Sequence, residues 1–173
     1  MFATGLSVQQ VDRYTKMKEI ESYVGTWKLS GVLLAPPEFK GMEFKGILNV
    51  GWTLGHTALE FKARSTGDKP GGPTMEASGI VGYNEATTYE KQGFTASFAW
   101  SQDGRMLPLH GDFKGKALVL EGAPTPESWD KIKLRIKAND TKDGKSWDVY
   151  SYEGKDERLF IEMMLTKVAP GQL

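Results

Sequence analysis

Apolar and polar residues alternate along most of this chain, and short stretches of turn-forming residues interrupt the alternation. In segment 26–34, for example, Trp27, Leu29 and Leu33 are apolar and Lys28 is polar. Such alternation is typical of a half-buried β-strand, because successive side chains of a strand point to opposite faces of the sheet. Comparable segments follow at 42–52, 57–63, 74–83, 94–100, 107–113, 116–122, 130–138, 145–154 and 159–165. The pattern predicts an all-β protein of about ten short strands.

The connections between these segments are short and rich in turn residues, as in STGDKPGG, SQDG, APTPES and NDTKDGK. Connections of this length join antiparallel neighbours, since parallel strands need long crossovers. The chain also has 20 glycines, which suit the corners and bulges of a closed barrel. The expected architecture is therefore an antiparallel up-and-down β-barrel, which with about eight to ten strands can hold a small ligand inside.

One short helix is expected before the barrel. Ser7 can serve as its N-cap, and Gly25 ends it. The apolar residues between them recur at roughly helical spacing: Val8, Val11, Tyr14, Met17, Ile20 and Val24. The 173 residues suffice for one domain with its own core. We expect a single domain over 1–173, with the helix at 7–24 and the barrel at 25–168.

Composition excludes several classes of protein. The 22 basic and 22 acidic residues balance, so no net field favours nucleic acid or an anionic membrane surface. No apolar run approaches the roughly eighteen residues that a membrane helix needs. The chain has no cysteine, and its first residues lack the pattern of a signal peptide, so we expect a cytoplasmic protein. Exposed edge strands would allow a homodimer, although nothing in the sequence requires one.

Several motifs together resemble one known family. The stretch YVGTWKLSG contains Gly25-x-Trp27, which looks like the entry motif of the lipocalin and calycin barrels. Three further segments make the resemblance more specific: GIVGYNEATTYEKQGF, LHGDFKGKALVLEG and the final strand with Glu162 followed by Thr166-Lys167. In this order and spacing they resemble the calycin-like bacterial family called domain of unknown function fifteen seventy-nine, from Ile20 to Val168. That family carries no established activity, so the resemblance implies a fold and leaves the function open.

The resemblance also implies a role for two residues. In lipocalins the motif tryptophan packs beneath a basic residue of a late strand and closes the floor of the barrel. Trp27 corresponds to that tryptophan, and Lys167 stands in the basic position.

Metal, haem and nucleophilic chemistry find little support in the sequence. The two histidines, His56 and His110, belong to no metal-binding spacing, and alternation in the segment around His56 predicts that it faces solvent. A haem-binding small barrel would need a histidine in a late strand, and none follows His110. No Gly-x-Ser-x-Gly elbow occurs either. We expect neither a metal nor a cofactor.

Aromatic residues point more clearly to a possible ligand pocket than the histidines and serines do. Trp52, Tyr83, Phe94, Phe98 and Trp100 all fall on the apolar parity of their strands, which points inward in a barrel. They form either a packed core or the wall of a pocket in which a few polar groups orient a ligand.

Glu162 is a carboxylate inside the apolar run LFIEMML. If the preceding turn is centred near Lys155 and Asp156, the last two strands form a hairpin. One face then carries Asp148, Tyr150, Tyr152, Phe160, Glu162 and Met164, with Tyr150 opposite Glu162, and the other face carries Trp147, Val149, Ile161, Met163 and Leu165.

Three interpretations of Glu162 remain open. It points outward beneath the helix, bonded to Tyr150 or a lysine; it points inward and orients a ligand; or it is an inward general acid or base with a pKa raised by desolvation.

The leading hypothesis for function is binding of a small, largely apolar molecule inside the barrel. The alternative is a small-barrel enzyme, such as a cyclase or isomerase of a hydrophobic secondary metabolite, with Glu162 as its catalytic residue. A third hypothesis is a filled barrel whose outer surface is an interaction module. The candidate ligand-binding residues are Trp52, Tyr83, Phe98, Trp100, Tyr150, Tyr152, Glu162 and Met164.

Overall fold

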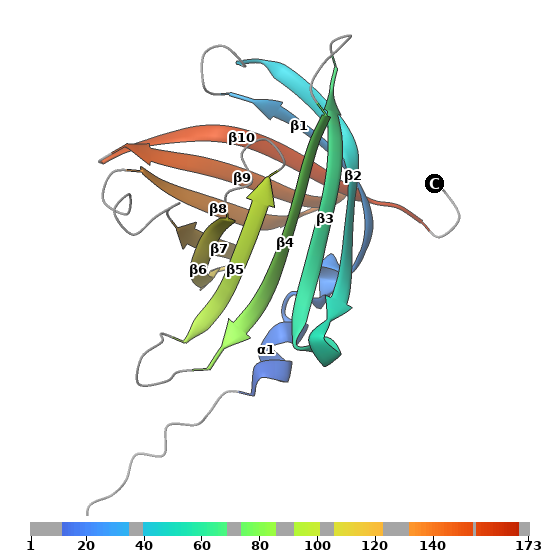
Figure 1. The fold of residues 1–173 in the computed structure, drawn as a ribbon, viewed down its shortest axis with the longest axis vertical. Coiled ribbons are helices and arrows are strands. Elements are labelled where there is room, and N and C mark those ends of the chain that lie inside the picture. Colours follow the sequence, from blue (N-terminus) through green and yellow to red (C-terminus); the bar gives the residue numbers. More distant parts are fainter. Residues whose placement is uncertain are drawn as a thin grey trace, which may run out of the picture.

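Ten antiparallel strands close into one barrel in the computed structural model, which describes residues 12–34, 40–68, 74–85, 92–100, 106–122, 132–153 and 155–169 (Figure 1). The predicted all-β barrel is thereby confirmed. The elements in chain order are α1 (Arg13–Lys18), η1 (Glu21–Tyr23), β1 (Gly25–Leu33), β2 (Met42–Thr53), η3 (Leu54–His56), β3 (Ala58–Gly67), β4 (Thr74–Asn84), β5 (Gly93–Trp100), β6 (Met106–Lys114), β7 (Ala117–Gly122), β8 (Ile132–Thr141), β9 (Gly144–Glu153) and β10 (Asp156–Lys167).

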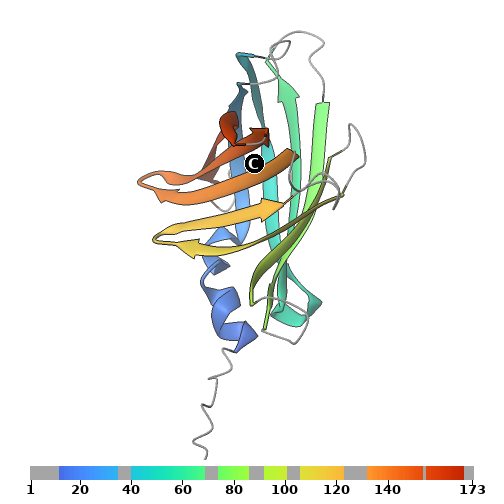
Figure 2. The same cartoon turned by 90° about the vertical axis from the view of Figure 1, so that its left-hand side faces the viewer.

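The barrel closes where β1 pairs with β10, with Trp27 opposite Lys167 and Leu33 opposite Ile161. Every other pair joins strands that are consecutive in the chain, so the topology is a meander. Because the sheet has no first or last strand, the exposed edges that would have allowed a homodimer are absent among the described strands. Strands β2–β5 cross β8–β10 at a steep angle on the other side of the barrel (Figures 1 and 2).

The alternation read from the sequence determines which side chains face the interior of the barrel. Along β2, Met42, Phe44, Leu48 and Val50 are buried, while the residues between them are half-buried or exposed. The same inward parity gives a core in which the following side chains are fully buried: Phe94, Met17, Ile20, Leu48, Leu59 and Leu165.

The helix is shorter than predicted. Asp12 caps α1, accepting hydrogen bonds from the Tyr14 backbone N–H (3.2 Å) and the Thr15 hydroxyl (3.3 Å). The α-helix ends at Lys18, and Glu21–Tyr23 forms a separate 3₁₀ turn, so the expected single helix over 7–24 is wrong in extent. Ser7 lies outside the described residues. Met17, Ile20 and Tyr23 are all buried under the barrel.

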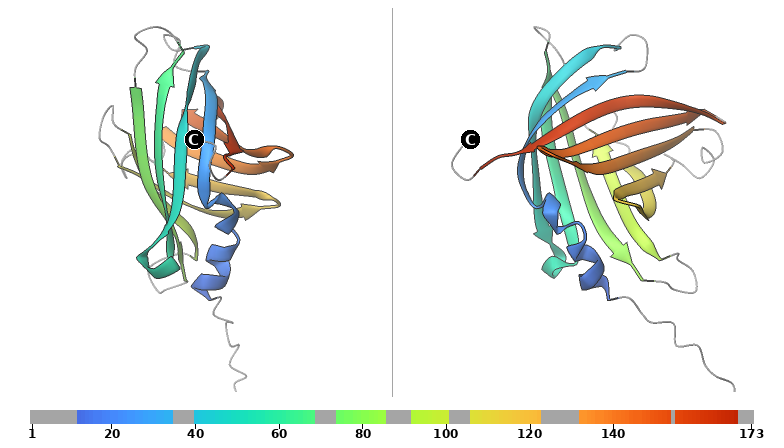
Figure 3. Two further views of the ribbon diagram at one scale, coloured as in Figure 1. Left: turned by 90° about the vertical axis from the view of Figure 1, so that its right-hand side faces the viewer. Right: turned by 180° about the vertical axis from the view of Figure 1, so that it is seen from behind.

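This N-terminal segment covers one end of the barrel, which we call the floor (Figure 3). Trp27 is only 3% exposed there, its indole N–H donates to the Tyr23 carbonyl (2.7 Å), and the Lys167 Nζ lies 5.3 Å from its ring centroid. The arrangement implied by the resemblance, a tryptophan beneath a late-strand cation, is therefore present.

Lys145, in β9, holds the N-terminal segment against the barrel. Its buried ammonium donates to the Ser22 hydroxyl (2.9 Å), pairs with the Asp140 carboxylate and lies 4.0 Å from the Tyr23 ring centroid. A buried ammonium requires such partners, because an unpaired buried charge is costly.

The opposite end, which we call the mouth, is the end at which β1, β3, β5, β7 and β9 finish and β2, β4, β6, β8 and β10 begin. No helix among the described residues is long and apolar enough to cross a membrane.

Candidate functional site: an apolar cavity in the barrel

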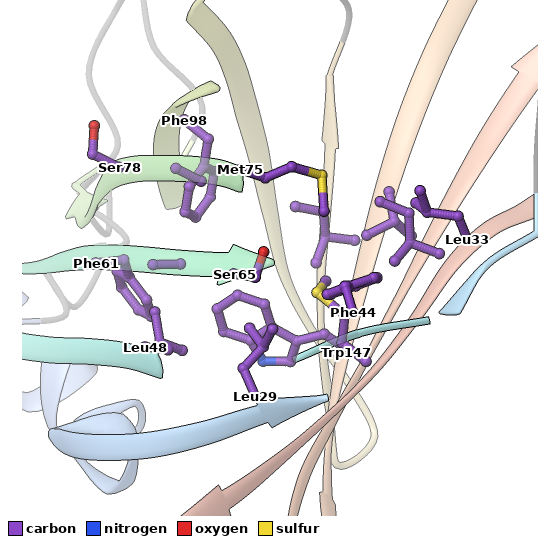
Figure 4. A pocket seen from close by; sticks show the side chains of 16 residues that line it. Leu29, Leu33, Phe44, Leu48, Phe61, Ser65, Met75, Ser78, Phe98 and Trp147 are labelled. Atoms are coloured by element: carbon purple, nitrogen blue, oxygen red, sulfur yellow. The ribbon is translucent and has the colours of Figure 1, made fainter. Parts of the chain in front are cut away.

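A cavity of about 120 Å³ lies inside the barrel (Figure 4). Eight of the strands contribute to its lining, because inward side chains of neighbouring strands meet around a common axis. The lining is almost wholly apolar and consists of Leu29, Leu33, Phe44, Leu48, Phe61, Ala63, Ser65, Met75, Ala77, Ser78, Phe98, Ile136, Trp147, Val149, Ile161 and Met163.

Three aromatic side chains form a layer across the barrel at the floor side of this cavity. The Phe61 ring centroid lies 6.0 Å from that of Phe98, nearly edge-on, and 5.8 Å from that of Trp147. A smaller void of about 30 Å³ lies among Tyr23, Ile20 and neighbouring residues, and the same three aromatic residues line it as well. The layer therefore separates the cavity from the floor.

Gly79 makes room for one member of the layer. A Cβ at this position would lie 2.2 Å from the Phe98 ring, which pairs across from it in β5. The absence of a side chain on β4 thus lets Phe98 lie flat against the strand instead of filling the cavity.

The lining includes few polar groups. Ser65 points inward from β3 and is 8% exposed. The Trp147 N–H is buried near the Tyr23 hydroxyl without a hydrogen bond of normal geometry, and burial raises the pKa of Tyr23. No ionisable side chain occurs among the described lining residues.

The predicted inward aromatic residues take different places. Phe98 lines the cavity, whereas Tyr83 is buried beside Phe94, with ring centroids 5.1 Å apart. Trp52 packs against the core and lies 5.5 Å from the His56 ring, outside the cavity lining. The side chain of Trp100 lies outside the described residues.

The predicted register of the last hairpin is wrong. Tyr152 pairs with Glu157 instead of Phe160, so the hairpin begins three residues out of the predicted register. A bulge between Leu159 and Ile161 then shifts the pairing by one residue, and Glu162 pairs with Asp148. The extra residue is Phe160, which packs against the core together with Ile161 and Met163. Placing Phe160 on the face of Glu162 was therefore also wrong.

Glu162 points outward and is exposed. The interior face is that of Val149, Ile161 and Met163, as in the first interpretation. Two parts of that interpretation do not hold. Glu162 makes no hydrogen bond or ion pair with the described residues, and it pairs with Val32, at the end of β1 remote from the helix. The inward interpretations are overturned, and with them the placement of this carboxylate as an interior catalytic group.

Tyr150, Tyr152 and Met164 share the outer face with Glu162, so none of these four candidates reaches the cavity. Arg135, in β8, forms two ion pairs on this outer face. Its guanidinium pairs with Glu121 (2.8 Å) and Glu157 (3.0 Å) and lies 4.8 Å from the Tyr152 ring centroid.

The raised pKa of Tyr152 predicts that the protein loses stability at alkaline pH. Burial raises its pKa to about 12, and the Glu157 carboxylate beside its hydroxyl adds to the rise. In the unfolded chain tyrosine ionises near pH 10, so between about pH 10 and 12 the unfolded state loses its proton first and is favoured. We expect the urea midpoint to fall through this range, and less steeply in Tyr152→Phe. Parallel curves for the two proteins would contradict the assignment.

Sequence reasoning missed Trp147 and Met163 as lining residues. Both belong to the face Trp147, Val149, Ile161, Met163 and Leu165, which is wholly apolar, whereas the face of Glu162 also carries Asp148. This difference in polarity was the signal that could have identified the interior face.

Metal ligands do not gather in the described part of the chain, where no group of three or more histidine or carboxylate side chains is placed to hold an ion. His56 is exposed, as predicted, and His110 is half-buried.

Comparisons with known proteins show the fold alone. No family model and no curated protein matches the chain. Among solved structures, the chain is similar to the crystal structure of Rv2717c from M. tuberculosis, with a TM-score of 0.63 and 13% sequence identity over 91% of this chain and 100% of that one. The similarity supports an all-β barrel.

Proposed function

We propose that this protein is a calycin-like barrel that binds a small, largely apolar molecule in its interior. The observation that carries the proposal is the cavity of about 120 Å³ enclosed by apolar side chains from eight strands. Ligand sites are typically concave and mostly apolar, with a small number of polar groups. The floor arrangement of Trp27 and Lys167 supports the calycin-like class.

The size of the cavity limits the ligand. An apolar cavity of roughly 150 Å³ in another protein binds benzene. The present cavity is somewhat smaller, so a molecule with a single ring is the size that this comparison supports. The aromatic layer of Phe61, Phe98 and Trp147 would supply the contact surface.

Binding is better supported than catalysis. A cyclase or isomerase that uses a buried carboxylate needs such a group beside its substrate, and the described lining offers none. Glu162 lies on the outer face, where it cannot act on a molecule in the cavity. The cavity also argues against a filled barrel with only an outer interaction surface.

Filling the cavity should abolish binding. Ala77 lines the cavity beside its cross-strand partner Ala63, so the Ala77→Leu side chain would occupy the space of the ligand. Wild-type protein is expected to bind benzene in calorimetric titration, and Ala77→Leu should bind it at least about tenfold more weakly, a loss of about 1.4 kcal/mol.

Ala99→Leu is the matched control. Ala99 lies on the outer face of β5 opposite Ser78, so the same side chain is added to the same sheet without entering the cavity. Thermal unfolding checks that both variants are folded. Equal benzene affinity in Ala77→Leu and Ala99→Leu would contradict the proposed site.

A further inference from the structure

The Ser65 hydroxyl is a polar group in the cavity that has no hydrogen-bond partner among the described residues. Ser65 is 8% exposed and lines the cavity from β3. Its cross-strand neighbours are Gly46, which has no side chain, and Met75, whose thioether is a weak acceptor. The hydroxyl makes no hydrogen bond with the described residues, and it is not among the polar atoms that protein atoms enclose completely. Figure 4 shows its oxygen directed away from Trp147.

The other polar groups of the described lining are not within reach of a ligand. Protein atoms enclose the Trp147 N–H beside Tyr23. Ser78 is exposed and its side chain points away from the cavity (Figure 4). Ser65 is therefore the polar contact that the described lining offers.

Ser65 also lies at a defined height in the barrel. It is four residues nearer the mouth along β3 than Phe61, which belongs to the aromatic layer. The small pair Ala63 and Ala77 lies between them and leaves the space open. A bound molecule can thus rest its apolar body on the aromatic layer while its mouth-side end meets the Ser65 hydroxyl.

We infer that the ligand is a neutral single-ring molecule that carries a hydroxyl or carbonyl oxygen, and that this oxygen hydrogen-bonds to Ser65. The inference rests on the proposed function of the cavity. A serine hydroxyl both donates and accepts, so it pairs with either oxygen. A carboxylate would not be favoured, because no ionisable side chain of the described lining offsets its loss of hydration.

Three single-ring probes test this ligand class: benzene, phenol and benzoate. Ser65→Ala should weaken binding of phenol about fivefold and change benzene affinity less than about twofold, because only the hydrogen bond is removed. Wild-type protein should bind benzoate at least about tenfold more weakly than phenol. Ser97→Ala removes a hydroxyl from the outer face of β5, opposite the exposed Ile80 and outside the cavity lining, and should leave all three affinities unchanged.

The outcomes separate this inference from the proposal beneath it. If both benzene and phenol bind but Ser65→Ala affects them equally, the role of Ser65 is overturned while the binding cavity stands. If benzoate binds as tightly as phenol, the restriction to neutral ligands is overturned. If none of the probes binds wild-type protein, the proposed function itself fails.

Discussion

Replacing Gly111 with alanine is expected to destabilise the barrel by about 3 kcal/mol. A Cβ at Gly111 would lie 1.8 Å from the Val119 carbonyl oxygen and 2.9 Å from its carbon, both in the backbone of β7. A backbone cannot rotate away as a side chain can. β7 is also held on its other side by β8, so it cannot withdraw without breaking a second ladder. Urea denaturation of wild-type protein and Gly111→Ala measures the loss.

Gly51→Ala provides the matched control. Gly51 lies in β2, is exposed, and has no atom within 4 Å of the position its Cβ would take. Alanine there reduces the conformational entropy of the unfolded chain, so stability should stay equal or rise by about 0.5 kcal/mol. A Gly111→Ala protein as stable as Gly51→Ala would contradict the close approach of β6 and β7.

Trp27→Ala is expected to lower the free energy of unfolding by about 3–5 kcal/mol. The substitution empties a buried site at the floor and leaves the Tyr23 carbonyl without its indole donor. It also removes the ring over which Lys167 lies. The measurement is urea denaturation followed by circular dichroism, which does not depend on the fluorescence of the lost tryptophan.

Lys167→Met separates burial of the ring from its contact with the cation. Lys167 is exposed, and an exposed cation–π contact contributes about 0.5–1 kcal/mol. Methionine keeps an apolar stem over the indole, so this variant should lose no more than that amount. A loss from Lys167→Met as large as that from Trp27→Ala would show that the cation, rather than burial of the ring, closes the floor.

The strands could be predicted because their signals are local. Alternation of apolar and polar residues follows from the backbone geometry of a strand, and turn residues mark where each strand ends. The inward parity of Tyr83, Phe94 and Phe98 was readable in the same way, and the structure places all three inside.

The helix and the last hairpin were mispredicted because distant contacts decide them. The 3₁₀ turn after Ile20 places Tyr23 where its carbonyl accepts from the Trp27 indole and its ring centroid lies 4.0 Å from the Lys145 ammonium, and periodicity within the segment cannot reveal these contacts. The last hairpin begins three residues out of the predicted register, with Tyr152 opposite Glu157, and the bulge at Phe160 then changes the pairing by one residue. Alternation within one strand cannot reveal such an insertion, since it depends on how two strands are paired.

The sequence by itself determined that this chain forms a meander of short antiparallel strands, because turn chemistry and period-two alternation are properties of neighbouring residues. Only the tertiary structure decided which face of β9 and β10 is inside, and hence that Trp147 and Met163, not Tyr150 and Glu162, face the interior. The cavity likewise depends on the tertiary structure. Its volume is what remains after side chains from eight strands, far apart in the chain, have packed around Ser65.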